Sequence, residues 1–307
     1  MTIPIILDMD PGIDDAAAIV MALNHPELEV KLITTVAGNV SVDKTTLNAL
    51  KLVEFFKKNT PVAAGAKAPL KKEFVDAANI HGESGMPGYD FPDVTTKPLD
   101  KDAVNAIVEI LNTATEPMTI VATGAYTNIA NLLTQHPEIK SKIKNLLLMG
   151  GSISGGNVSS VAEFNVFTDP DAAKIVFESG LPITMIGLDV TLKALLTAET
   201  IEKMSEIGEA GKMLHDLTVA YNDVHDGGKP MHDVNTIFYL VNPDAIKTTD
   251  YWIDVITEGP AIGGTIADTQ SRFHDEGQTN TSVGVDIDAA QFNQWFLEQL
   301  QAIEDNN

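Results

Sequence analysis

The 307-residue sequence has no cysteine and few basic residues. The absence of cysteine excludes disulfides, thiolate metal ligands and a cysteine nucleophile. Only 20 lysines and arginines stand against 43 aspartates and glutamates, which gives a net charge of −23. Such a chain lacks the cationic surface that holds nucleic-acid phosphates or anionic lipids. We therefore expect neither a nucleic acid nor a membrane as a partner.

Long apolar runs are also missing from the sequence. No segment approaches the ~20 apolar residues of a membrane-spanning helix. The first residues lack the basic flank and the small-residue cleavage site of a signal peptide. Hydrophobic residues nevertheless make up 44% of the chain and charged residues 21%, which is typical of globular proteins rather than disordered ones. We expect a folded, cytoplasmic protein.

Short apolar, β-branched runs alternate with longer amphipathic segments along the first two thirds of the chain. The runs that predict buried strands are residues 3–7, 30–36, 118–122, 145–149 and 183–188. The segments that predict helices are residues 15–24, 41–58, 102–115, 127–135 and 171–179. This alternation predicts an α/β, Rossmann-like fold with a mostly parallel sheet and helices on both faces.

The C-terminal part of the sequence is helix-rich. Helices are predicted over residues 197–206, 209–223, 233–241 and 289–303, and strands over 251–256 and 282–286. Length alone allows one domain or two, but no linker or internal repeat divides the chain, so we expect a single domain over residues 1–307. Residues 66–99 are rich in proline and glycine without a regular period, and long loops of this kind commonly carry binding residues.

Four aspartates lie close together near the amino terminus. Asp8 and Asp10 end the first predicted strand, and Asp14 and Asp15 open the following helix after a Pro-Gly turn. Capping of a helix explains Asp14 or Asp15 taken singly. It does not explain Asp8 and Asp10, because unpaired carboxylates at the end of a buried strand are costly. Ligands bind at this edge of a parallel sheet, so the four carboxylates favour a hard cation, either Ca²⁺ or Mg²⁺.

Two other functions are compatible with these carboxylates. Asp8-x-Asp10 after a first strand resembles the motif of haloacid-dehalogenase-like phosphatases, in which the first aspartate is phosphorylated and the second is the acid or base. That interpretation gives no role to Asp14 and Asp15. A protein that binds Ca²⁺ or a nucleoside without catalysis is the other possibility. Phosphate-loop, dinucleotide-binding and nucleophile-elbow motifs are absent from the sequence.

Residues 8–15 resemble the aspartate signature of the calcium-dependent nucleoside hydrolases of the inosine-uridine preferring type. Further blocks that resemble this family follow in order at residues 34–39, 81–85, 123–130, 148–151, 156–157, 162–165, 169–170 and 232–233. Bacterial ribonucleoside hydrolases of broad specificity are especially similar. The resemblance implies hydrolysis of the N-glycosidic bond of purine and pyrimidine ribonucleosides to free base and ribose, by a Ca²⁺-bound water that Asp10 activates.

The resemblance also implies roles for individual residues. The Ca²⁺ ligands would be Asp10, Asp15, Asp233 and the main-chain carbonyl of Thr123. Asp10 would also be the general base, and His232 the acid that protonates the leaving base. The groups expected around the substrate are Asp14, Asn157, Glu163 and Asn165 at the ribose hydroxyls, Asn39 beside the metal cluster, His81 on a mobile loop, and Phe164 and Tyr221 near the base. A homotetramer or homodimer is also implied.

Several of these residues have ordinary structural explanations when they are taken singly. Histidines are commonly half-buried structural residues, asparagines are common in turns, and Phe164 could fill core space. The sequence also departs from the family pattern at Ala125-Tyr126, where the family often has Pro-Leu, and at Val234, where it often has proline. Residues 221–231 align poorly with the family. The sequence therefore leaves the preferred base open.

Overall fold

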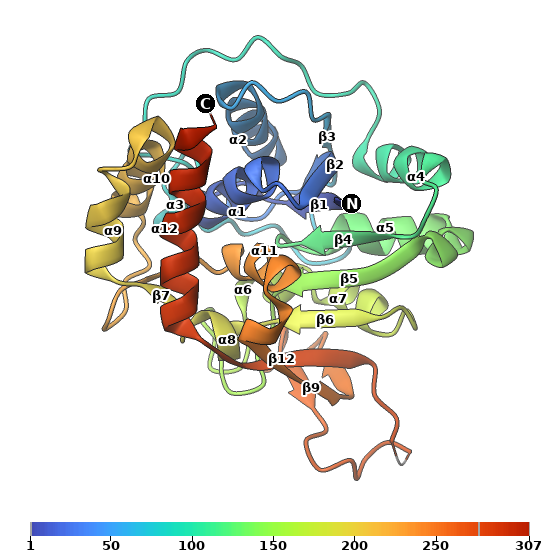
Figure 1. The fold of residues 1–307 in the computed structure, drawn as a ribbon. Coiled ribbons are helices and arrows are strands. Elements are labelled where there is room, and N and C mark those ends of the chain that lie inside the picture. Colours follow the sequence, from blue (N-terminus) through green and yellow to red (C-terminus); the bar gives the residue numbers. More distant parts are fainter. Residues whose placement is uncertain (1, 276, 307) are drawn as a thin grey trace.

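The computed structural model describes residues 2–275 and 277–306, and its centre is an eight-stranded sheet (Figure 1). In sheet order the strands are β3 (Val62–Ala64), β2 (Leu28–Thr35), β1 (Ile3–Met9), β4 (Met118–Ala122), β5 (Ile143–Met149), β6 (Ile183–Ile186), β12 (Thr281–Ile287) and β9 (Ile246–Tyr251). Neighbouring strands run parallel except β12 and β9, which are antiparallel. The predicted α/β fold with a mostly parallel sheet is confirmed.

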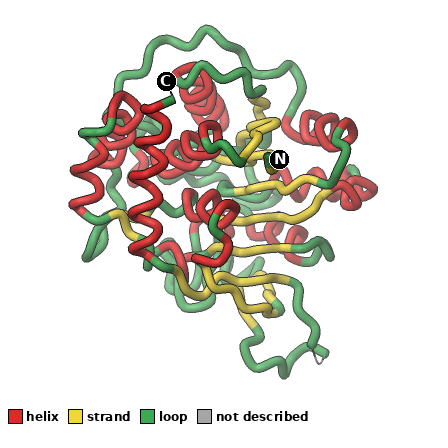
Figure 2. The backbone as a smooth tube through the Cα atoms, viewed as in Figure 1, coloured by secondary structure: helices red, strands yellow, loops and turns green. Residues whose placement is uncertain are grey.

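Helices cover both faces of the sheet (Figure 2). One face packs against α1 (Ile13–Asn24), α2 (Val42–Phe55), α10 (Gly208–Ala220), α11 (Val234–Val241) and α12 (Ala289–Asp305). The other face packs against α4 (Ala103–Thr113), α5 (Thr127–Gln135) and α7 (Pro170–Phe177). Leu7 and Met9 of β1 point to the first face and Ile6 points to the second, as the alternation of side chains along a strand requires. Burial on both faces explains the continuous apolar runs in the sequence.

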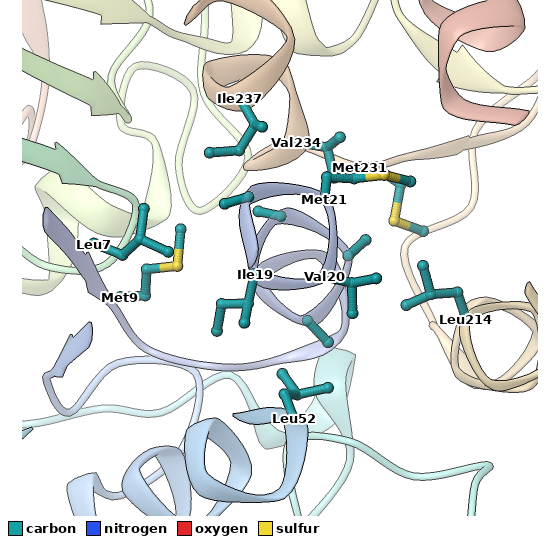
Figure 3. Packing of buried hydrophobic residues seen from close by; sticks show 14 of the residues in the cluster. Leu7, Met9, Ile19, Val20, Met21, Leu52, Leu214, Met231, Val234 and Ile237 are labelled. Atoms are coloured by element: carbon teal, nitrogen blue, oxygen red, sulfur yellow. The ribbon is translucent and has the colours of Figure 1, made fainter. Parts of the chain in front are cut away.

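Helix α1 is surrounded by other elements on all sides. Every residue from Ile13 to Ala22 is buried, and the helix contacts β2, α2, α10, α11 and α12. Figure 3 shows its side chains packed against Leu7 of β1, Leu52 of α2 and Leu214 of α10. The small side chains of Ala16, Ala17 and Ala18 allow this close packing. The first turn of α1 is therefore held firmly beneath the carboxyl ends of the strands.

Several short elements complete the structure. The short helices are α3 (Ala78–His81), η1 (Pro137–Lys142), α6 (Phe164–Thr168), α8 (Leu188–Thr191), α9 (Ala198–Met204) and η2 (Pro243–Ala245). Two small sheets have two strands each: β7 (Leu195–Leu196) pairs with β8 (Lys229–Pro230), and β10 (Ile253–Val255) pairs with β11 (Thr265–Ala267). Within the predicted loop 66–99 only α3 is regular. Among the described residues, no helix is long and apolar enough to cross a membrane.

Most predicted elements differ from the observed ones by one to three residues at an end, and two of these differences have a clear structural reason. The strand predicted over 251–256 is divided, because Tyr251 ends β9 of the main sheet and Ile253–Val255 forms β10 of a separate ribbon. The helix predicted over 209–223 ends at Ala220. At that end Lys229 Nζ donates hydrogen bonds to the carbonyls of Thr218 and Tyr221. This contact satisfies carbonyls at a helix end, and the sequence pattern of the helix itself does not reveal it.

The order of the strands determines where a ligand can bind. In the order β3-β2-β1-β4-β5-β6, successive strands are added on one side of β1 up to β3 and on its other side from β4 onwards, so the order of addition reverses between β1 and β4. In an open parallel sheet a crevice forms at this point, outside the carboxyl ends of the strands. The segments that follow β1 and β4 carry Asp10 and Thr123.

Candidate active site

A cavity lies at the carboxyl ends of the central strands and gathers the residues predicted from the sequence. Those that line it are Asp14, Asn39, His81, Thr123, Asn157, Glu163, Phe164, Asn165, Tyr221, His232 and Asp233. Asp10 and Asp15 are fully buried and are joined to Asn39 by hydrogen bonds. The structure therefore brings together residues from positions 10 to 233 of the chain.

Three carboxylates form an acidic cluster, which we define as Asp14, Asp15 and Asp233. One oxygen of each lies within 4.8 Å of the others, and all three residues are buried. Asp14 and Asp15 belong to the first turn of α1, and Asp233 immediately precedes α11. Contact between these two helices brings the carboxylates together. The arrangement has the hard oxygen donors that Ca²⁺ and Mg²⁺ prefer.

The acidic cluster and Asp10 carry an unfavourable electrostatic energy. Burial, and then the charge of Asp15, raise the pKa of Asp14 to about 7 and the pKa of Asp10 well above its usual range. Burial and the charges of Asp14 and Asp15 likewise raise the pKa of Asp233 well above its usual range. Asp10 Oδ1 and Asp14 Oδ1 are buried without a hydrogen-bond partner. A cation would relieve both the repulsion and the unsatisfied oxygens.

Asp10 is held by only one of its two carboxylate oxygens. The main-chain N–H of Asn39 donates to Asp10 Oδ2 at 2.6 Å. A Cβ atom on Gly38 would lie 2.0 Å from the same Oδ2, so the loop can approach the carboxylate this closely only with glycine at that position. Asp10 Oδ1 has no partner, and a Cβ on Gly124 would lie 2.8 Å from it. Glycines on both sides leave room around the free oxygen.

Asp15 and Thr123 connect α1 to the end of β4. Thr123 Oγ1 donates to Asp15 Oδ1 at 3.0 Å, while Gly12 N and Asn39 Nδ2 donate to Asp15 Oδ2, each at 3.0 Å. The carbonyl of Thr123 accepts a hydrogen bond from Asn165 Nδ2 at 2.6 Å. A carbonyl oxygen has two lone pairs, so this contact leaves one for a further ligand.

Asp8 lies outside the acidic cluster and the cavity. Its Oδ1 accepts hydrogen bonds from Thr34 Oγ1 at 2.6 Å and Asn128 Nδ2 at 2.8 Å. Burial raises its pKa to about 6 despite these two donors. The expectation that Asp8 joins the other three carboxylates of the amino-terminal group is therefore wrong, because it links β1 to β2 and α5. The Asp8 side chain neither lines the cavity nor bonds to a residue that lines it, which argues against Asp8 as the nucleophile of a phosphatase.

Glu163 and Asn165 fix the wall of the cavity near β5. Glu163 begins α6, and its Oε1 accepts from Asn165 N at 2.9 Å while its Oε2 accepts from Gly151 N at 2.8 Å. Asn165 Nδ2 donates to the carbonyls of Thr123 and Met149. Asn157 Oδ1 accepts from the N–H of Phe164 at 3.0 Å. Main-chain groups therefore orient these polar side chains before any ligand binds.

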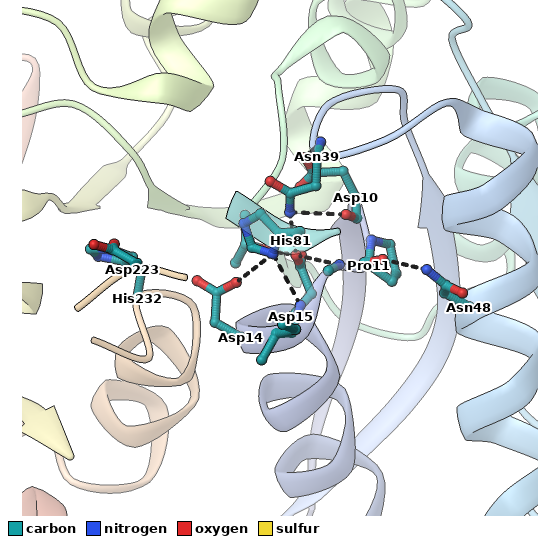
Figure 4. A network of polar contacts seen from close by, with 12 residues as sticks. Asp10, Pro11, Asp14, Asp15, Asn39, Asn48, His81, Asp223 and His232 are labelled. Atoms are coloured by element: carbon teal, nitrogen blue, oxygen red, sulfur yellow. Dashed lines mark hydrogen bonds and ion pairs between the residues drawn. The ribbon is translucent and has the colours of Figure 1, made fainter. Parts of the chain in front are cut away.

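His81 packs against the first turn of α1. Its Nδ1 accepts the main-chain N–H of Ile13 at 3.2 Å, and a Cβ on Gly12 would lie 2.4 Å from that nitrogen. Burial, and then the charge of His232, lower the pKa of His81 to about 3. The ring is thus neutral, and its 4.0 Å contact with Asp14 Oδ1 is not an ion pair. Figure 4 shows Asp14 turned towards His81 in this network.

His232 has an oxygen partner at each ring nitrogen. Its Nδ1 lies 2.7 Å from Thr191 Oγ1, and its Nε2 lies 3.2 Å from Asp223 Oδ2. Burial alone would lower the pKa of His232, but the hydrogen bond with Asp223 and the charge of Asp14 outweigh it and raise the pKa. The ring therefore favours its charged form more than a buried histidine usually does.

Asp223 lines the cavity but is not among the site residues predicted from the sequence. It lies in the poorly aligned segment 221–231, and the helix predicted over 209–223 would have placed it on a helix. The Gly227-Gly228 pair that follows Asp223 is a sequence signal for a turn rather than a helix. Both glycines have positive φ in the structure, 103° and 152°. The cavity is also lined by four residues for which the sequence predicted no role, Ala77, Ile80, Met149 and Val158.

The similarity to known proteins covers nearly the whole chain. Residues 5–294 match the family described as inosine-uridine preferring nucleoside hydrolase. The chain belongs to this family. It is 48% identical over 303 residues to the non-specific ribonucleoside hydrolase RihC of Klebsiella pneumoniae, a match that covers 98% of this chain and 99% of that protein. It is 47% identical over 299 residues to RihC of Salmonella newport, covering 96% of each.

Solved structures of nucleoside hydrolases share the fold of this one. The purine-preferring ribonucleoside hydrolase from Gardnerella vaginalis has a TM-score of 0.92 at 34% identity and covers 99% of this chain and 100% of that chain. A plant nucleoside hydrolase has a TM-score of 0.91 at 30% identity, covering 98% of this chain and 99% of that chain. The predicted family and enzyme class are confirmed.

This nucleoside hydrolase has an Asp-rich site that can hold a metal ion, in keeping with a metal-dependent family. One departure from the family pattern has a structural explanation. Tyr126 is fully buried, and its hydroxyl donates to the carbonyl of Met149 at 2.9 Å. The same carbonyl accepts from Asn165 Nδ2. Tyr126 therefore supports the wall of the cavity from behind.

Proposed function

We propose that this enzyme hydrolyses the N-glycosidic bond of purine and pyrimidine ribonucleosides, releasing the free base and ribose. Membership of the nucleoside hydrolase family supports the reaction, and the RihC relatives, named as non-specific, support the breadth of substrates. The observation that carries the proposal is the cavity itself. Asp14, Asp233 and His232 line it. Asp10, with one free carboxylate oxygen, and Asp15 are bonded to Asn39, another lining residue.

The residues present fit a bound divalent cation, and we propose Ca²⁺. The unpartnered oxygens of Asp10 and Asp14 and the mutual repulsion of the buried carboxylates support a cation. The ligands would be Asp10, Asp15, Asp233 and the carbonyl of Thr123. Oxygen donors alone suit Ca²⁺ and Mg²⁺ equally well, and the resemblance to calcium-dependent enzymes favours Ca²⁺. When bound, the ion would supply positive charge that acidifies and orients a water and attracts sugar hydroxyls.

The side chains at the acidic end of the cavity would act on the sugar and the water. Asp10 would take a proton from the attacking water through its free oxygen. Asp14, Asn157, Glu163 and Asn165 would hold the ribose hydroxyls, with Asn39 keeping Asp10 and Asp15 in place. Negative charge beneath the ring stabilises the oxocarbenium-like transition state of glycosidic cleavage.

The part of the cavity lined by His81, Phe164, Tyr221 and His232 would receive the base. His232 would donate a proton to the departing base, which lowers the negative charge that develops on it. Its raised pKa supports this role. The rings of His81 and Tyr221 lie with their centroids 5.1 Å apart and, with Phe164, would face the base. His81 accepts a hydrogen bond and is neutral, so it would contribute shape rather than a proton.

The decisive experiment measures free base released from inosine and from uridine by the purified protein, with Ca²⁺ and after chelation. We expect release with Ca²⁺ and its loss after chelation, with recovery when Ca²⁺ is returned. Absence of release from any ribonucleoside would overturn the proposal. Binding of the nucleoside without cleavage would indicate a non-catalytic binding protein instead.

We also propose that residues 1–307 form one domain, that the protein acts in the cytoplasm and that it assembles as a homotetramer or homodimer. The match to the family over nearly the whole length supports the first point. The lack of cysteine, which is compatible with a reducing compartment, supports the second, and the family resemblance supports the third. Sedimentation at micromolar concentration tests the assembly. A monomer would contradict it.

A further inference from the structure

Asp223 occupies a distinctive place beside His232. It follows the end of α10, lines the cavity and has a side chain that is 24% exposed. Figure 4 shows Asp223 beside His232, and Asp223 Oδ2 lies 3.2 Å from His232 Nε2. At the other nitrogen of the ring, Nδ1 lies 2.7 Å from Thr191 Oγ1. Two partners on opposite edges of the imidazole hold the plane of the ring.

The chemistry of Asp223 determines which nitrogen of His232 carries a hydrogen. A carboxylate only accepts hydrogen bonds, so Nε2 must be the donor in this contact. The hydroxyl of Thr191 can either donate or accept, so it is compatible with any state of Nδ1. The contact with Asp223 therefore selects a ring with hydrogen on Nε2.

Asp223 is itself held in place by neighbouring groups. His225 Nε2 lies 2.8 Å from its other oxygen, Oδ1. The preceding residue, Asn222, donates from its main-chain N–H to the carbonyl of Ile80, at 3.2 Å. The carboxylate is therefore fixed with respect to α3, which carries another wall of the cavity. At 3.2 Å its contact with His232 is at the long end of N–H···O distances, so it can orient the ring without holding the hydrogen tightly.

We propose that Asp223 is a positioning residue that keeps a hydrogen on Nε2 of His232 at the wall of the cavity, where a nitrogen of the leaving base takes the place of Asp223 as the acceptor of this N–H. The proposal rests on the proposed function, in which His232 is the acid. As the glycosidic C–N bond breaks, its electron pair goes to the base and the hydrogen passes from Nε2 to a base nitrogen. The ring keeps its second hydrogen on Nδ1, which Thr191 Oγ1 accepts. Asp223 stays ionised throughout.

Two substrates with different leaving groups distinguish the loss of this positioning role from a general disruption of the active site. Inosine needs a proton on its departing base, whereas 4-nitrophenyl β-ribofuranoside releases a stable phenolate that needs little help from an acid. For Asp223→Asn we expect kcat with inosine to fall about 10-fold to 100-fold, the order of a lost proton donor, with little change in KM. We expect turnover of the nitrophenyl riboside to be nearly unchanged.

Matched variants complete the kinetic test. Asp226→Asn makes the same change of charge in the same segment, at an exposed residue that does not line the cavity, and should leave both substrates unaffected. Asp223→Glu keeps a carboxylate and should retain more inosine turnover than Asp223→Ala. Equal losses on both substrates, or no loss with inosine in Asp223→Asn, would overturn the proposal. A wild-type protein that cleaves neither substrate would instead overturn the proposed function.

A spectroscopic measurement tests the positioning without any turnover. Nitrogen-15 NMR of histidine-labelled protein reports which ring nitrogen carries hydrogen, and the signal absent from His232→Asn identifies the ring. We expect hydrogen on Nε2 in the wild type. In Asp223→Asn the side-chain amide can donate to Nε2, so we expect that nitrogen to lose its hydrogen. An unchanged Nε2 signal in the variant would contradict the proposal.

Discussion

Asp10 has the arrangement of contacts that a general base requires. The N–H of Asn39 fixes one carboxylate oxygen, and the other oxygen is free on the side of Gly124. Asp8, at the end of β1, also has one unpartnered oxygen, but its Oδ1 accepts from Thr34 and Asn128, which join it to β2 and α5 rather than to the acidic cluster. Two aspartates that look equivalent in the sequence therefore differ in what they can do.

This difference leads to a prediction for the variant Asp10→Asn. An amide cannot take a proton from water, yet its oxygen can still accept from the N–H of Asn39. We expect the fold and the melting temperature of the metal-free protein to be preserved and kcat with inosine to fall at least about 100-fold. Steady-state kinetics and circular dichroism measure both quantities. Asp8→Asn is the matched control, and should retain turnover within about tenfold because the Asp8 side chain bonds to Thr34 and Asn128 and to no residue that lines the cavity.

For single residues, the sequence predicted which side chains lie together in the site, but not which hydrogen bonds each of them makes. The spacing of Asp10, Asp14 and Asp15 after a strand was sufficient to indicate an acidic site. The hydrogen bonds that separate Asp8 from them come from Thr34 and Asn128, on other elements. The sequence did not predict Asp223 as a site residue, because its contact with His232 depends on the path of the loop between them, which no local sequence pattern reveals.

Helix α1 shows how a single element supports the site. Its residues are buried all round, so its position depends on packing rather than on its own helical propensity. The residues at its first turn, Asp14 and Asp15, supply two members of the acidic cluster. A substitution that loosens the packing of α1 would therefore also displace Asp14 and Asp15 in the site.

The variant Ile19→Ala tests the contribution of this packing. Ile19 is fully buried in α1, and its truncation should lower the free energy of unfolding by about 2 to 5 kcal/mol, because the methyl groups leave a cavity that the neighbours cannot fill. Ile175→Ala in α7 removes the same atoms from a side chain that is 37% exposed and should cost clearly less. Denaturant unfolding of the two variants compares them. Equal losses would show that α1 is less tightly packed than described.

The end of α10 provides a second test at the level of an element. Lys229 Nζ donates to the carbonyls of Thr218, Val219 and Tyr221, and this contact ends the helix before Asp223. For Lys229→Met we expect a loss of about 1 kcal/mol in stability and faster hydrogen exchange in residues 221–228. Unchanged exchange in this segment would mean that other contacts hold it.

The bounds of elements were harder to predict than their existence. The helix predicted over 209–223 was too long because the turn at Ala220 is stabilised by Lys229, which no local pattern reveals. The strand predicted over 251–256 spans two sheets, because Asp268 N donates to the carbonyl of Trp252 where the chain leaves β9 for β10. Long buried strands such as β1 and β5 were clear, since burial on both faces gives continuous apolar runs.

At the scale of the whole molecule, the sheet order places the acidic residues at one crevice. A ligand that binds only the folded chain stabilises it by about 2.7 kcal/mol at 100 times its Kd. We expect Ca²⁺ to raise the melting temperature of the chelated protein, with a shift that grows with Ca²⁺ concentration. Differential scanning fluorimetry measures this effect.

A variant provides the control for this thermal experiment. Asp233→Asn removes one charge from the acidic cluster, so the Ca²⁺-dependent shift should shrink strongly while the metal-free protein remains folded. Asp244→Asn, in the short η2 helix, changes the same charge away from the cavity and should keep the full shift. A shift of the same size in both variants would place the stabilising ion elsewhere.

The contact between α1 and α11 joins Asp15, near the start of the chain, to Asp233, more than two thirds of the way along it. A nascent chain that ends before residue 232 lacks His232 and Asp233, although it already contains the four amino-terminal aspartates. Such widely separated contacts close late, because the intervening chain must first be ordered. Under the proposed ligand set, the ion can be fully held only once α11 has packed against α1, so a chain that stops before residue 232 would lack both the ligand Asp233 and the proposed acid.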